Sequence, residues 1–178
     1  MKIDQGFLPI LGESPRVLIL GSMPSVKSLE YQQYYAHPQN TFWWIMSELF
    51  DFDPLESYDV RAMYLKQNKV AVWDVIQACH RPGSLDSSID SASIQANDFS
   101  TLLSEKSSIK LVIFNGQAAQ KIFKKHLLSA RTVDSEAANR SIKKYTGDFL
   151  VMPSTSPANA ATKREMKLEH WRALNAYF

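Results

Sequence analysis

Four short apolar runs, separated by helical patterns, constrain the fold of this chain more than any other feature. The runs are near-continuous rather than alternating, as strands covered on both faces of a sheet require. They are "RVLILG" (16–21), "KVAVWD" (69–74), "KLVIFN" (110–115) and "DFLVMP" (148–153). Apolar residues recur at helical spacing over 42–50, 99–103 and 119–123. The pattern predicts an α/β fold, a three-layer α/β/α sandwich around a short, mainly parallel four-stranded sheet.

The end of the chain predicts a further helix, at about 162–178. Leu168, Trp171, Leu174 and Phe178 fall on one side of it, where they can close a flank of the sheet. The stretch "RPGSLDSSIDSAS" (81–93) is polar but short enough to be a loop within the domain. With 178 residues and no repeat or linker, the sequence predicts one domain over 1–178.

Cysteine content and charge limit the possible environments and partners. Cys79 is the one cysteine, so neither an internal disulfide nor a four-cysteine metal site can form. No stretch has the length of a membrane span or the form of a signal peptide, so we expect a cytoplasmic protein without a membrane partner. A net charge of +2 leaves a nucleic-acid partner open. We expect no metal and no redox cofactor.

Polar segments follow all four predicted strands. They contain "GSMPS" and later "YAHPQN", then "DVIQACHRPGSLDSS", "NGQAA" and "PSTSPANAATKR". In an open parallel sheet these segments meet beyond the carboxyl ends of the strands, where ligands bind. They offer amides, hydroxyls and tight turns, which suit recognition of a polar heterocycle and a phosphate.

The segment "GSMPSVKSLEYQQYYAHPQNTFWW" (21–44) resembles the uracil-DNA glycosylase superfamily. Its first motif there is a G-x-x-P turn after the first strand. "YAHPQNTFW" is similar to the F-A-H-P-x-N-x-F-W segment of mismatch-specific uracil glycosylases, and "GSMPS" with "STSPANA" resembles the hypoxanthine-DNA glycosylase branch. The resemblance implies a monomeric, monofunctional enzyme that hydrolyses the N-glycosidic bond of a flipped deaminated base in DNA. Hypoxanthine is the expected base, with uracil and xanthine as alternatives.

The resemblance also implies a catalytic residue. Many superfamily members carry Asp or Asn at the third position of the G-x-x-P turn, where this chain has Met23, which cannot orient a water molecule. In the hypoxanthine branch the Asn of the HPxN segment is implicated instead, which corresponds to Asn40. A neutral amide is a poor base, but it can orient water toward an electron-poor anomeric carbon.

Further roles follow from the same resemblance. Tyr35 corresponds to an aromatic residue that stacks on the flipped base, and the Asn115 amide can read the lactam edge that hypoxanthine and uracil share. Met23, Pro24 and His37 are expected beside the base. Phosphate binding is expected from Ser25, Ser154, Ser156, Pro157, Asn159, Lys163 and Arg164.

Structural roles compete with these functional ones. Asn40 is also a good helix N-cap, His37 a turn residue and Asn115 a strand end. Trp43 and Trp44 fit a core, and Asp74 fits a turn. His80, Arg81 and Ser84 line either the pocket or only the loop. The lysine pairs 124–125 and 143–144 fit a solvated face better than a DNA contact.

Two other functions remain open from the sequence. One is a lesion-DNA-binding protein without catalytic activity, which Met23 in the turn raises. The other is a hydrolase of free nucleosides or nucleotides.

Overall fold

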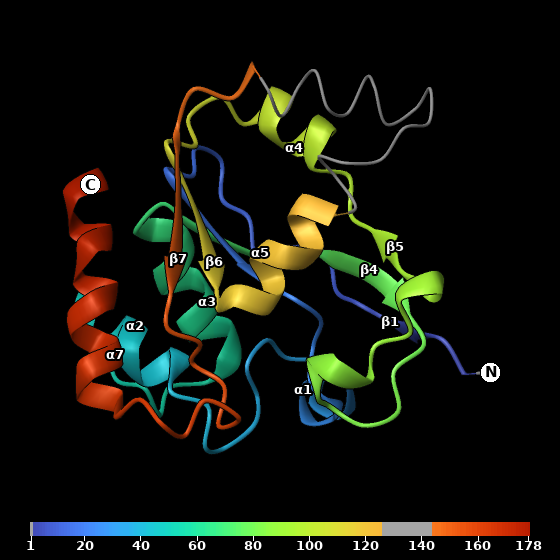
Figure 1. The fold of residues 1–178 in the computed structure, drawn as a ribbon. Helices are drawn as coiled ribbons and strands as arrows, with labels where there is room; N and C mark the ends of the chain where they lie inside the picture. Colours follow the sequence, from blue (N-terminus) through green and yellow to red (C-terminus); the bar gives the residue numbers. More distant parts are fainter. Residues whose placement is uncertain (1, 126–143) are drawn as a thin grey trace.

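The computed structural model describes residues 2–125 and 144–178 (Figure 1). The principal strands are β2 (Val17–Gly21), β3 (Val70–Asp74), β6 (Leu111–Asn115) and β7 (Asp148–Met152). The helices are α1 (Val26–Tyr31), α2 (Phe42–Phe50), α3 (Tyr58–Gln67), α4 (Phe99–Glu105), α5 (Gln117–Phe123) and α7 (Arg164–Trp171). Short 3-10 turns cover η1 (Asp86–Ser88), η2 (Ser91–Ser93) and η4 (Arg172–Tyr177). No helix in these ranges is long and apolar enough to cross a membrane.

The four predicted strands form one parallel sheet in the order β3-β2-β6-β7. Each strand begins and ends within one residue of the predicted run. All of β2 is buried, because it lies between two neighbours and under helices on both faces. The carboxyl ends therefore meet at one edge of the molecule, the lower end in Figure 1, as the sequence predicts.

Alternate residues of the strands enter two hydrophobic cores, one on each face of the sheet. On one face Val17, Ile19 and Ile113 pack against α2, α3 and α7. On the other face Leu18 and Phe114 pack against α4 and α5. Helices thus cover both faces, which confirms the three-layer α/β/α sandwich.

A second, small antiparallel sheet was not predicted. It joins β1 (Asp4–Gln5), β4 (Ile76–Cys79) and β5 (Gln95–Ala96) in the order β1-β4-β5. The polar segment expected after Asp74 therefore begins with a strand over 76–79. β4 is four residues long and exposes Gln77, so it lacks the continuous apolar run that identified the other strands.

Two further expectations need correction. β7 is an edge strand and is not covered on both faces, since Phe149 is 40% and Val151 37% exposed. In the last helical segment Leu168, Trp171 and Leu174 are buried, whereas Phe178 is exposed and its ring meets Phe50 edge-on. The α-helix ends at Trp171 and continues as a 3-10 helix. Lys143 lies outside the described residues.

Candidate active site at the carboxyl ends of the strands

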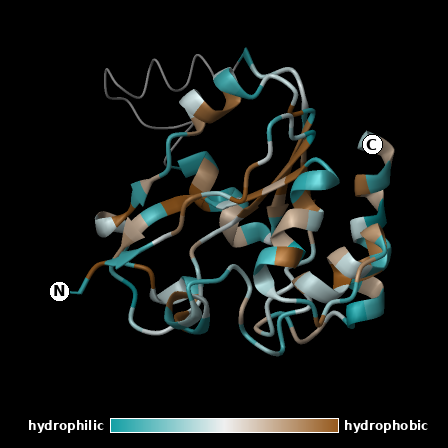
Figure 2. Cartoon of the chain, turned by 180° about the vertical axis from the view of Figure 1, so that it is seen from behind, coloured by the Kyte–Doolittle hydropathy of each residue, from teal (hydrophilic) through white to brown (hydrophobic). Residues whose placement is uncertain are grey.

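A cavity of about 90 Å³ opens where the strands β2, β3 and β6 end. Its lining comes from the segments that follow these strands and β7. The lining residues are Gly21, Ser22, Met23, Pro24, Ser25, Ser28, Tyr34, Tyr35, Asn40, Asp74, Ser84, Asp86, Asn115, Ser154, Thr155 and Ser156. Figure 2 shows hydrophobic colour along the strands and mixed colours at this lower edge, and most of the lining residues carry a hydroxyl, amide or carboxyl group. The site therefore presents mainly hydroxyls, amides and backbone groups above an apolar core.

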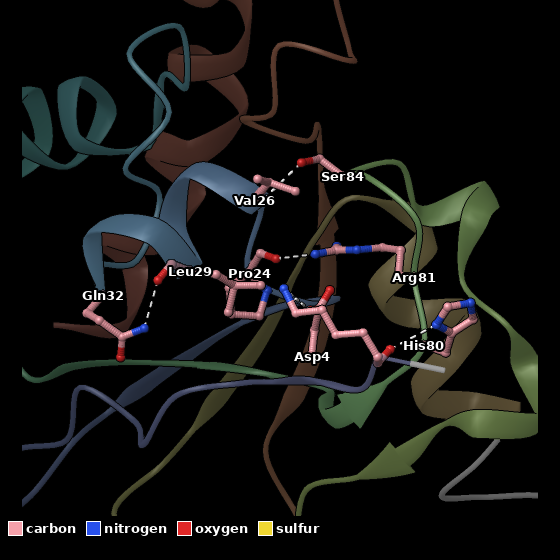
Figure 3. A network of polar contacts seen from close by, with 9 residues as sticks. Asp4, Pro24, Val26, Leu29, Gln32, His80, Arg81 and Ser84 are labelled. Atoms are coloured by element: carbon pink, nitrogen blue, oxygen red, sulfur yellow. Dashed lines mark hydrogen bonds and ion pairs between the residues drawn. The ribbon is translucent and has the colours of Figure 1, made fainter.

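The turn after β2 is fixed at both of its ends. Ser25 is the N-cap of α1, and its hydroxyl accepts the N–H of Ser28 at 3.1 Å. From β4 onward the chain brings in Arg81, whose guanidinium donates to the carbonyl oxygens of Met23 and Pro24. Figure 3 shows the contact with Pro24. Arg81 is 4% exposed, so this arginine is a buried brace of the turn and does not reach solvent as a phosphate-binding group.

Asn40 lies in the cavity wall immediately before α2. Its Oδ1 accepts the N–H of Phe42 at 3.0 Å, and its own N–H donates to the His37 carbonyl at 2.8 Å. The side chain thus covers a free N–H of the first helical turn from one residue before the N-cap. The prediction of Asn40 as the N-cap itself is wrong, because the N-cap is Thr41, whose side chain makes no capping bond. Since a carbonyl oxygen has two lone pairs, this contact leaves one of them for a water molecule.

Tyr35 lines the same cavity and adopts a left-handed backbone conformation with φ of 56°. One face of its ring stacks on Phe42 at a centroid distance of 3.9 Å and an interplanar angle of 25°. The hydroxyl is buried without a hydrogen-bond partner among the described residues, and burial raises its pKa. A non-glycine residue at positive φ is uncommon and indicates that the surrounding structure holds this ring in place.

Asn115 ends β6 with both sides of its amide engaged. Its Nδ2 donates to the Thr155 hydroxyl at 2.9 Å, and its Oδ1 accepts the Thr155 N–H at 2.9 Å. The Thr155 carbonyl in turn accepts the N–H of Thr41 at 3.1 Å. Thr155, which is fully buried, thus joins the ends of β6 and β7 to the start of α2.

The segment after β7 forms a compact turn held by its own side chains. Ser154 Oγ accepts the Ser156 N–H at 3.2 Å, and Ser156 Oγ accepts the Ala158 N–H at 3.2 Å. Asn159 Nδ2 donates to the Ser154 carbonyl at 3.1 Å, while Lys167 Nζ donates to the Ser156 carbonyl at 3.4 Å. The turn is therefore formed before any ligand binds.

Some predicted residues lie outside the cavity lining. These are His37, Pro157, Asn159, Lys163 and Arg164. His37 forms a turn, because its Nδ1 accepts the Gln39 N–H at 3.2 Å. Arg164 pairs with Glu165 at 2.8 Å and lies 4.7 Å from the Trp44 ring centroid, so its charge is already partnered. Lys163 is exposed at the start of α7.

For two lining residues the sequence contained little or no sign of a functional role. Asp74, at the end of β3, is 3% exposed, and burial raises its pKa to about 7. Thr155 was not singled out at all, and only its place between two predicted serines could have pointed to it. The described residues contain no group of three His, Cys, Asp or Glu side chains that could hold a metal ion.

Comparison with known proteins agrees with this arrangement. The family described as "Uracil DNA glycosylase superfamily" matches residues 9–178. The fold and the site agree with this family, because the chain has a parallel sheet, polar loops at the carboxyl ends of its strands and a G-x-x-P turn after β2. The chain belongs to the uracil DNA glycosylase superfamily.

Individual relatives are close to one branch of that superfamily. The chain is 42% identical over 115 residues to a protein named "Hypoxanthine DNA glycosylase" from Methanosarcina barkeri, covering 64% of this chain and 71% of the relative. It is 39% identical over 118 residues to a protein of the same name from Methanosarcina acetivorans, covering 66% and 73%. A solution structure of a putative uracil DNA glycosylase from Methanosarcina acetivorans superposes with a TM-score of 0.76 at 32% identity, covering 97% of this chain and 96% of that one.

Proposed function

We propose that this protein is a monofunctional DNA glycosylase that excises hypoxanthine from DNA and leaves an abasic site. Uracil and xanthine are the alternative bases. The observation that carries the proposal is the placement of Asn40 in the wall of a polar cavity, in a superfamily member whose relatives are named hypoxanthine DNA glycosylases. We further propose that residues 1–178 act as one domain, as a cytoplasmic monomer.

The chemistry proposed for Asn40 is the positioning of water. With one lone pair of Oδ1 taken by Phe42, the other can accept a hydrogen bond from water and so direct the water oxygen toward C1′ of the sugar. As the glycosidic bond lengthens, positive charge builds on the sugar and a weakly activated water is sufficient. The base is reached only after it flips out of the duplex, which takes roughly a few kcal/mol and less where pairing is weak.

Tyr35 supports the proposal as a stacking platform. Phe42 packs against one face of the ring and holds it in place, so little side-chain entropy is lost when the base binds. Stacking of a base on an aromatic ring contributes about 1–3 kcal/mol. We propose that Met23, Pro24 and Asn115 complete the contacts to the base, and that His37 acts through the turn that carries Asn40.

Phosphate binding is proposed for the segments after β2 and β7. Ser25, Ser154 and Ser156 line the cavity and bring hydroxyls and backbone N–H groups, and Pro157 and Asn159 shape the second segment. Lys163 and Arg164 add positive charge at the start of α7. No lysine is among the residues described as lining the cavity, which favours hydrolysis over Schiff-base chemistry with strand cleavage.

The test is excision from labelled duplexes that carry one hypoxanthine, uracil or xanthine, followed by alkaline cleavage of abasic sites. We expect alkali-dependent scission with hypoxanthine, and a loss of about 100- to 1000-fold in single-turnover rate for Asn40→Ala. Gln39→Ala, one position earlier and exposed, is the matched control and should keep the rate. Because Asn40 also accepts a hydrogen bond from the first residue of α2, thermal unfolding and binding of lesion DNA are measured for both variants.

Three results would contradict the proposal. Scission without alkali would mean a strand-cleaving enzyme. Tight, salt-sensitive binding with no base released would favour a lesion reader without chemistry. Equal activity on free deoxyinosine would favour a nucleoside hydrolase.

A further inference from the structure

Among the described residues, Asp74 is the one ionisable side chain that ends a strand of the parallel sheet and lines the cavity; its strand, β3, lies at the edge of that sheet. Its carboxyl group is 3% exposed, yet Oδ2 has no hydrogen-bond partner among the described residues. Oδ1 lies against Gly21, where a Cβ atom would overlap it. A buried polar oxygen without a partner at the wall of a ligand cavity is costly in the free protein and indicates a contact that a ligand completes.

The surroundings of this carboxyl favour its neutral form. Burial is the main cause that raises the pKa of Asp74 to about 7; Arg81 acts in the opposite direction, and Asp86 adds a smaller upward effect. Arg81 gives hydrogen bonds to the carbonyls of Met23 and Pro24, and no ion pair in the described ranges includes Asp74.

The other charged or titratable neighbours do not change this balance. Asp86, from η1, is held by the Ser22 hydroxyl at 2.5 Å. From the segment between α1 and α2, Tyr34 and Tyr35 present hydroxyls whose pKa values are raised by burial, so both are neutral. Arg81 follows β4 and is the one cation among these groups. The cavity thus surrounds Asp74 mainly with neutral groups.

The amide proposed to read the base is largely occupied. Asn115 gives one N–H and one lone pair to Thr155, so only one N–H and one lone pair remain, at the outer sides of the amide. Asp74 ends β3, which is separated from β6 by β2, and its carboxyl group lines the same cavity. Asp74 Oδ2 makes no hydrogen bond, whereas the oxygen and the nitrogen of the Asn115 amide each already make one.

Building on the function proposed above, we propose that Asp74 binds the flipped base as a carboxylic acid. Its O–H donates to the carbonyl oxygen of the base, and its C=O accepts the adjacent lactam N–H. An acid and a lactam are complementary in this way because each presents one donor beside one acceptor. An ionised carboxylate has only acceptors, so it would repel the carbonyl oxygen that the acid binds.

This inference is tested by the pH dependence of excision. Single-turnover rates on hypoxanthine duplexes at limiting protein concentration are measured from about pH 5.5 to about pH 8.5 for the natural protein, Asp74→Asn and Asp74→Ala. The apparent second-order rate constant of the natural protein should fall about tenfold per pH unit above pH 7. Asp74→Asn keeps a donor beside an acceptor but cannot ionise, so its profile should be flat and should exceed the natural protein at the alkaline end.

Asp74→Ala removes both contacts and should lose about 10- to 100-fold at every pH. Asp90→Asn is the matched control, since Asp90 caps η2 through its Oδ1 and lies outside the cavity lining. It should keep the alkaline decline. If the base itself titrates, the same change appears in the Asp74→Asn profile. The difference between the two profiles therefore gives the contribution of Asp74.

Binding measurements separate this inference from the proposed function. A duplex with 2′-fluoro-deoxyinosine, whose glycosidic bond is stable, is titrated at each pH, and affinity should weaken on the alkaline side except in Asp74→Asn. If the natural protein shows this binding pattern but never releases hypoxanthine, the proposed function fails while the contact stands. If rates rise with pH and Asp74→Asn is as impaired as Asp74→Ala, the carboxylate acts as a base and the inference is wrong. Natural rates and affinities in both variants would also overturn it.

Discussion

The buried Asp74 carboxyl predicts an unusual dependence of stability on pH in the protein without DNA. Its pKa is raised from 3.8 to about 7, so between these values the folded chain holds a proton that the unfolded chain has released. The free energy of unfolding must then decrease as pH rises through this window. Asp74→Asn cannot ionise and should lack the decrease.

The size of the effect follows from the width of the window. About three pH units at about 1.4 kcal/mol per unit give roughly 4 kcal/mol. The group is 3% exposed, so solvent screens this value little, although structural relaxation on ionisation makes it an upper bound. We therefore expect Asp74→Asn to gain stability relative to the natural protein by about 2–4 kcal/mol between about pH 4 and about pH 8.

The assay is urea unfolding followed by tryptophan fluorescence at intervals across this pH range. Asp98→Asn serves as a control of opposite sign, because hydrogen bonds from Thr101 lower the pKa of Asp98 at the N-cap of α4. Its carboxylate stabilises the fold above its unfolded pKa, and that contribution is lost as pH falls. A difference between Asp74→Asn and the natural protein that stays constant with pH would refute the argument that Asp74 is buried in a neutral environment.

Two further substitutions test how the cavity is assembled. Gly21→Ala places a methyl group where Asp74 Oδ1 lies, so we expect destabilisation by about 1–3 kcal/mol and loss of excision, measured by unfolding and single-turnover assays; unchanged values would contradict the close contact. Thr155→Val keeps the shape but removes the hydroxyl that accepts from Asn115, so we expect a loss of about 1 kcal/mol and slower excision, and natural stability would mean that this hydrogen bond contributes nothing.

The sheet was predictable because its physics is local. Continuous apolar runs such as 16–21 are stable only between two covering layers, and the helical stripes between them supply those layers. β4 escaped prediction because it is a short strand between β1 and β5 in a small sheet and carries the exposed Gln77. Its strand conformation depends on partners that are remote in sequence.

The site was predictable in part for the same reason. Polar segments after parallel strands must converge, so Asn40, Tyr35, Asn115 and the two serines of the last segment were expected near one another, and all line one cavity. Contacts between segments could not be read from local pattern. The Asn115 amide bonds a residue 40 positions away. Burial of Asp74 likewise depends on how tightly Gly21 lets two strands approach.

The contact between Gly21 and Asp74 also restricts how this site can change over generations. Gly21 has no room for a side chain as long as a carboxyl occupies the space beside it. A larger residue at position 21 becomes tolerable only after position 74 has become smaller, whereas position 74 can change first. One order of substitutions is therefore open and the other passes through a protein that folds poorly. A lineage that retained the acid at the end of β3 would be held to glycine at the end of β2, whatever base its members excise.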